Sequence, residues 1–180
     1  MRCAPDAGDA ASVELLPARL VWKPMPEMSD ADLLDRFEQR TLPHEEWNHR
    51  AHVRVAFLYL RRLGLDRAIR TLRSGIRAYN AAVGIQESPT NGYHETITKA
   101  FATIVHAALA DLDPTELERM SSDEFCDDHP GLLDKHALSA YYSSECLAQP
   151  EAKRSFVEPD LAPLPHPGRT PRPMRGETSR

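Results

Sequence analysis

Apolar residues recur at the three- and four-residue spacing of a helix in several long stretches of this chain. The clearest stripe lies in residues 66–83 and is formed by Ile69, Leu72, Ile76, Tyr79 and Val83. A second stripe, in residues 93–112, is formed by Ile97, Phe101, Ile104, Val105 and Ala108. Helical spacing places each set on one face, so both stretches are predicted to be amphipathic helices with a buried side.

Capping signals predict two further helices. Ser29 and Asp32 form a capping-box-like start, with aspartate in place of glutamate, for a helix that ends before Pro43. Asn48 is a predicted N-cap and Gly64 a predicted stop for a helix over residues 48–63. Shorter helices are expected near residues 115–120, 122–128, 131–142 and 150–156. With no internal repeat and no convincing strand pair, the pattern predicts an all-α, compact single-domain bundle of about four main helices plus shorter C-terminal helices.

Composition changes at both ends of the helical region. Residues 1–27 mix alanine, aspartate and proline and are predicted to form a flexible N-terminal arm. Residues 28–158 contain the predicted helices and form the expected domain. Residues 159–180 hold repeated prolines and several arginines, which bury little apolar surface, so a disordered or partly polyproline tail is expected.

Charge and cysteine content narrow the classes of partner. The 180-residue chain has a net charge of -5, which argues against a nucleic-acid partner and against adsorption to anionic membranes. No apolar run approaches the roughly 20 residues that span a bilayer, and no signal peptide begins the chain. The three cysteines lack a C-x-x-C pair, so no disulfide framework is indicated. We therefore expect a cytoplasmic protein with no nucleic-acid and no membrane partner, and these features leave a homo-oligomer open.

Three of the eight histidines suggest a metal site. His49 and His52 are three residues apart, which places both rings on one helix face with Cβ atoms about 5–6 Å apart. His94 opens the predicted fourth helix and supplies a third ligand if that helix packs against the second. Three histidines with a bound water suit zinc, whereas two histidines and a carboxylate suit non-haem iron. The expected cofactor is therefore a divalent metal ion, iron or zinc.

Nearby polar residues are candidates for catalysis. Glu46 lies three residues before His49, as in di-iron bundles, but no second E-x-x-H occurs, which argues against a two-metal site. Glu95 points about 100° away from His94 on a helix and is therefore a candidate ligand partner or general base. Tyr93 is expected to line the same polar pocket.

Other interpretations of these residues stay open. The same histidines and glutamates can form a metal-free pocket, or a buried polar network without a chemical role. Asp127 to Pro130 is interpreted as a helix end and turn. The arginines at 50, 54, 61 and 62 are interpreted as a solvated face, and Cys126 and Cys146 as inert thiols. No nucleophile-elbow, P-loop or dinucleotide-binding motif occurs in the chain.

Two strings carry a resemblance to other proteins. They are Trp47-Asn48-His49-Arg50-Ala51-His52-Val53 and Tyr93-His94-Glu95-Thr96. Together with Tyr141-Tyr142-Ser143 and Phe156-Val157-Glu158-Pro159-Asp160, they resemble a widespread group of small helical bacterial proteins with H-x-x-H-V and Y-H-E-T motifs. The resemblance covers roughly residues 29–165. It implies a shared helical fold and shared polar residues, and it implies no particular activity.

The leading hypothesis is a metal-dependent enzyme, an oxygenase, hydrolase or lyase, that acts on a small organic molecule. His49, His52 and His94 are the proposed ligands, with Glu95, Glu46 and Tyr93 as catalytic candidates. The alternative is a helical module without catalytic activity, which binds a ligand or a protein partner through a buried His/Glu network.

Overall fold

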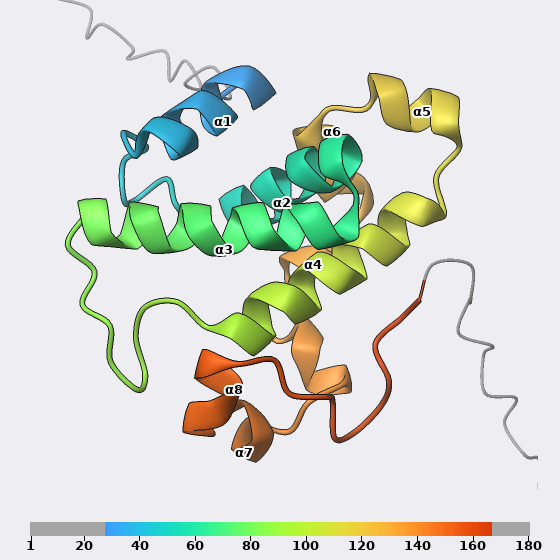
Figure 1. Ribbon diagram of the computed structural model, residues 1–180. Coiled ribbons are helices and arrows are strands. Elements are labelled where there is room, and N and C mark those ends of the chain that lie inside the picture. The colour runs from blue at the N-terminus through green and yellow to red at the C-terminus, as the bar shows by residue number, and fades with distance from the viewer. Residues whose placement is uncertain (1–27, 167–180) are drawn as a thin grey trace, which may run out of the picture.

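The computed structural model describes residues 28–166, and within them every regular element is helical. The main helices are α1 (Asp30–Gln39), α2 (His49–Leu63), α3 (Leu65–Ala82) and α4 (Glu95–Ala110), as Figure 1 shows. The shorter elements are α5 (Pro114–Arg119), α6 (Ser122–Asp128), the 3-10 turns η1 (Pro130–Leu133) and η2 (Ala137–Ala140), α7 (Ser144–Leu147) and α8 (Pro150–Arg154). The prediction of an all-α bundle with four main helices is confirmed. No helix in the described range has the length and hydropathy to cross a membrane.

Helix α2 lies at the centre of the bundle and packs against α1, α3, α4 and α6. Every side chain from Val53 to Leu60 is buried, so this helix has no solvent face over two turns. Its start is fixed by Asn48, whose side chain accepts a hydrogen bond from the backbone N–H of Ala51 at 3.1 Å. Gly64, at φ +72°, then turns the chain into α3. Both cap residues are those predicted from the sequence.

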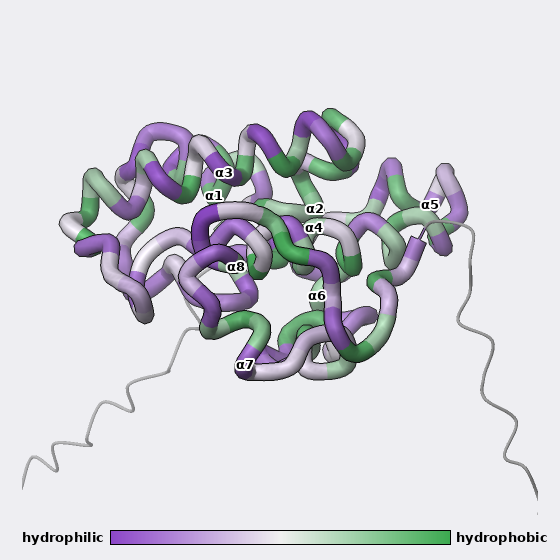
Figure 2. Tube along the Cα trace, turned by 60° about the horizontal axis from the view of Figure 1, so that its bottom comes forward, coloured by the Kyte–Doolittle hydropathy of each residue, from purple (hydrophilic) through white to green (hydrophobic). Residues whose placement is uncertain are grey.

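Helix α4 separates two apolar clusters. The larger cluster joins α1, α2, α3 and α6 to one side of α4 through Ala102, Val105 and Leu109. The smaller cluster joins Ala100 and Ile104, on another side of α4, to η2 and the C-terminal residues. Burial on two sides explains why α4 is more uniformly apolar than α3, along which hydrophilic and hydrophobic residues alternate (Figure 2).

A buried arginine connects three helices. Arg54 is 8% exposed, and its guanidinium donates to the Ser122 hydroxyl at 2.7 Å and to the Met28 carbonyl at 2.7 Å. It also pairs with the carboxylate of Asp30 at 3.2 Å. Because these partners belong to the starts of α1 and α6, Arg54 fixes both against α2.

Two other arginines of α2 also face neighbouring elements. Arg50 pairs with Asp123 and with Asp127, each at 2.7 Å, and Arg61 donates to the Met120 carbonyl at 2.6 Å. The predicted solvated arginine face is therefore wrong for positions 50, 54 and 61. The sequence places these side chains on α2 correctly, but their partners lie on α1 and near α5 and α6, far away in the chain.

Residues 155–166, which we call the C-terminal strap, pack on α4. Leu164 is buried in the smaller apolar cluster, and Asp160 accepts a hydrogen bond from the backbone N–H of Ser143 at 2.9 Å. The predicted domain boundary at residue 158 is therefore too early, because Leu164 and Asp160 hold the first part of the predicted tail against the rest of the fold. The predicted arm, residues 1–27, and the rest of the predicted tail, residues 167–180, lie outside the described residues.

The stretch 131–142 is not the single short helix expected from the sequence. It forms the two 3-10 turns, η1 and η2, with an interruption between them. There the carboxylate of Asp134 accepts a hydrogen bond from the backbone N–H of His136 at 2.8 Å. Such local side-chain bonding competes with helical bonding and favours turns.

Candidate functional site

A cavity of about 280 Å³ lies between α2, α3 and α4. Most of its wall is apolar and is formed by Trp47, Val53, Ala56, Leu72, Ile76, Ile97, Phe101, Ala102 and Val105. Its polar side chains are His49, His52, Tyr93, His94 and Thr98. The packing of the second helix against the fourth thus brings all three predicted histidines to the wall of one pocket.

His52 presents a neutral imidazole to this cavity. Its ring packs on the indole of Trp47, with the ring centroids 4.0 Å apart. Burial, followed by the nearby His49 ring, lowers the pKa of His52 to about 4. A hydrogen bond to the backbone of Asn48, one turn earlier, offsets part of this lowering. A neutral imidazole has one donor and one acceptor nitrogen, so the ring can still accept a hydrogen bond from a bound molecule.

His49 is held at the pocket edge by the turn η1. Its Nε2–H donates to the Leu132 carbonyl at 2.9 Å, and its ring meets the Phe101 ring edge-on at 5.0 Å between centroids. Because Nε2 carries the proton, Nδ1 of the neutral ring is the atom with a free lone pair. Burial lowers the pKa of His49 below its ordinary value.

His94 is the N-cap of α4. Its Nδ1 accepts a hydrogen bond from the backbone N–H of Ile97 at 3.3 Å, and its Nε2–H donates to the Leu147 carbonyl at 3.0 Å. Burial lowers the pKa of His94, which favours the neutral ring that this pair of bonds requires. Both ring nitrogens are thereby used, so the ring has no lone pair left for the metal-ligand role predicted from the sequence.

Glu95 faces away from the histidines. It is 4% exposed and pairs with the Arg73 guanidinium, which donates through Nε at 2.8 Å, while the Tyr93 hydroxyl donates at 2.9 Å. Burial alone would raise the pKa of Glu95, but the hydrogen bonds from Arg73 and Tyr93 hold it below its usual range. Glu95 is absent from the wall of the cavity. Its predicted role as general base beside the histidines therefore does not match its position.

The other two catalytic candidates are placed differently. Glu46 is exposed in the turn before α2 and does not line the cavity. Tyr93 does line it, but its hydroxyl is bonded to Glu95, and burial raises the pKa of that hydroxyl to about 12. Tyr93 is therefore a wall of the pocket with a protonated hydroxyl, and Glu46 lies outside it.

The side chains around the cavity do not fit a metal site of three or more protein ligands. No group of three histidine, cysteine or carboxylate side chains able to hold a metal ion occurs among residues 28–166. The physical reason is the engagement of His94 as a helix cap and of Glu95 in an ion pair. Only His49 and His52 retain the chemistry that was predicted for the cluster.

Some features of the site were not predicted. Phe101 was assigned to a buried stripe and instead forms part of the cavity wall next to His49. The partner of Glu95, Arg73, carries no sequence signal, because it lies 22 residues earlier on α3.

Outside the cavity, Cys126 matches its prediction as an inert thiol, since burial raises the pKa of its thiol to about 11.

No family model, curated protein or solved structure matches this chain. The resemblance to a group of small helical bacterial proteins therefore stays a prediction from the two histidine strings.

Proposed function

We propose that this protein binds a small, largely apolar organic molecule in the cavity between α2, α3 and α4. The observation that carries the proposal is an apolar cavity of about 280 Å³ whose wall includes the neutral imidazole of His52. An apolar cavity of about 150 Å³ is enough to hold benzene, so this one has room for a bicyclic aromatic molecule. A few polar groups in an apolar wall are typical of small-molecule sites.

The imidazoles of the pocket favour a ligand with a hydroxyl group. His52 and His49 are both neutral near pH 7, because burial lowers their pKa values. A neutral imidazole accepts a hydrogen bond from a phenol or alcohol and can take up its proton as a general base. A ligand hydroxyl next to His52 is thus recognised by the same group that would activate it.

The test compares 2-naphthol with naphthalene by isothermal titration calorimetry. We expect 2-naphthol to bind about 5–10-fold more tightly, the value of one net hydrogen bond. The Ala56→Leu variant, which fills the cavity one turn beyond His52, is expected to lose binding of both compounds. Ala82→Leu on the exposed side of α3 is the matched control. Equal affinities for the two compounds would remove the imidazole from recognition, and no binding at all would refute the proposal.

A metal-dependent enzyme is the second candidate function. It is favoured by the position of His49 and His52, which share one helix face and one cavity and are both neutral. Metal analysis of protein purified without a histidine tag tests it. Stoichiometric iron or zinc that is lost in the folded His49→Ala/His52→Ala variant supports this candidate, whereas a protein that takes up no divalent ion ends it.

A further inference from the structure

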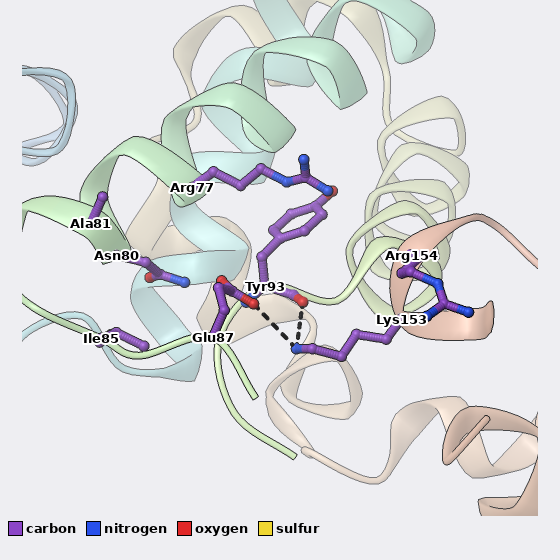
Figure 3. A pocket seen from close by; sticks show the side chains of 8 residues that line it. All are labelled: Arg77, Asn80, Ala81, Ile85, Glu87, Tyr93, Lys153 and Arg154. Atoms are coloured by element: carbon purple, nitrogen blue, oxygen red, sulfur yellow. Dashed lines mark hydrogen bonds and ion pairs between the residues drawn. The ribbon is translucent and has the colours of Figure 1, made fainter. Parts of the chain in front are cut away.

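Two adjoining hollows lie beyond Tyr93, outside the histidine pocket. One, of about 400 Å³, is bounded by α3, the loop before α4, and α8; the other, of about 410 Å³, extends over the start of α4. Arg77 and Arg154 line both hollows and thus form the boundary between them. Figure 3 shows Arg77 reaching from α3 over the Tyr93 ring and Lys153 extending from α8 toward Glu87, while Arg154 projects from α8 to the side away from Tyr93.

The side chains around these hollows are predominantly basic. The five basic side chains, from three different helices, are Arg73, Arg77, Lys99, Lys153 and Arg154. Only two carboxylates line the same walls, those of Glu87 and Glu95. Each already has a basic partner, because Glu87 pairs with Lys153 at 3.5 Å and Glu95 pairs with Arg73.

Three basic side chains therefore have no carboxylate within ion-pair distance in the described part of the chain: Arg77, Lys99 and Arg154. Two of them rest on aromatic rings. The Arg77 guanidinium lies 4.6 Å from the centre of the Tyr93 ring, and the Lys99 ammonium lies 3.7 Å from the centre of the Phe156 ring. Stacking on a ring positions a cation without neutralising its charge, so its N–H groups stay available to an anion.

We propose that these hollows bind a small molecule that carries a phosphate group. Arginine presents its N–H donors in a planar fork that matches phosphate oxygens, and two arginines here flank one site from different helices. The concentration of positive charge contrasts with the net charge of -5 of the whole chain. A hollow of about 400 Å³ also exceeds the size of a single phosphate and leaves room for the rest of a phosphorylated metabolite.

The test uses inorganic pyrophosphate as the probe, with the full chain, in isothermal titration calorimetry at about 0.15 M salt. We expect saturable binding that weakens at least about tenfold in Arg77→Ala/Arg154→Ala. The matched control is Arg67→Ala/Arg70→Ala, which removes the same charge from the exposed side of α3 and is expected to bind within about twofold of the parent. Circular dichroism and thermal unfolding verify that both pairs fold.

Three outcomes overturn the proposal. They are the absence of saturable binding, an equal loss in the control pair, and binding of a single-stranded oligonucleotide without binding of pyrophosphate. The result is independent of the histidine pocket, because Ala56→Leu lies outside both hollows and is expected to bind pyrophosphate like the parent.

Discussion

Replacing His52 by glutamine should change how the stability of the fold depends on pH. The pKa of His52 is about 4 in the folded protein, because of burial and the neighbouring His49, against 6.5 for a free imidazole. In the unfolded chain His52 therefore binds a proton below about pH 6.5, whereas in the folded chain it binds this proton only below about pH 4. Stability from this group is complete above the unfolded value and is lost as the pH falls towards the folded value.

The size of the effect follows from the linkage relation. Between about pH 7.5 and about pH 5, one group with these two pKa values lowers the free energy of unfolding by about 2 kcal/mol. We expect the wild type to lose this amount relative to His52→Gln, which cannot titrate. Urea unfolding at both pH values measures the two losses, with His136→Gln, at an exposed position, as the control that should follow the wild type. If His52→Gln loses as much stability as the wild type, His52 is not the neutral imidazole described above.

Three further substitutions test the packing around the site by urea unfolding. Arg54→Met removes the guanidinium that donates to the buried Ser122 hydroxyl at the start of α6, and should lower the free energy of unfolding by about 3 kcal/mol. A loss below about 1 kcal/mol would contradict the role of Arg54 in joining three helices. Gly92→Ala combines φ +91° with a Cβ 2.5 Å from the Glu87 carboxylate, and should cost about 2 kcal/mol because moving that carboxylate breaks its bonds to the Tyr93 N–H and Lys153. The comparison variant Gly84→Ala has φ +76° and open space around the new Cβ, and should cost about 1 kcal/mol. Equal losses would contradict the role of the Glu87 contact. Leu164→Ala should cost about 2–3 kcal/mol, and a change within about 0.5 kcal/mol would mean that the strap contributes little.

The helices were predictable because their signals are local. Ser29, Asn48 and Gly64 cap or end the helices at the expected positions, and each signal acts within one turn of the chain. The predicted turn after α6 is also confirmed, since the helix ends at Asp128 and Pro130 begins η1. Local propensity and side-chain spacing together were sufficient for the order and type of the main elements.

The site was predictable only in part, because its details depend on partners distant in sequence. The spacing of His49 and His52 correctly placed both rings in one pocket. The role of His94 could not be inferred from its neighbours in sequence. The Leu147 carbonyl, which accepts a hydrogen bond from its Nε2–H, lies 53 residues later. Likewise the burial of Arg54 depends on Ser122, 68 residues away. A helical period assigns a side chain to a face, and it does not say what covers that face.

The start of α4 depends on residues that the ribosome adds much later. The Leu147 carbonyl accepts the second hydrogen bond of the His94 ring. The buried Thr96 hydroxyl donates to the carbonyl of Ser155 and accepts from the N–H of Val157. Helices α1 to α3 have their sequence in full by residue 82, some 65 residues before the first of these contacts is synthesised. The wall of the cavity that contains His94 is thus finished last, after the three helices that precede it in the chain are complete.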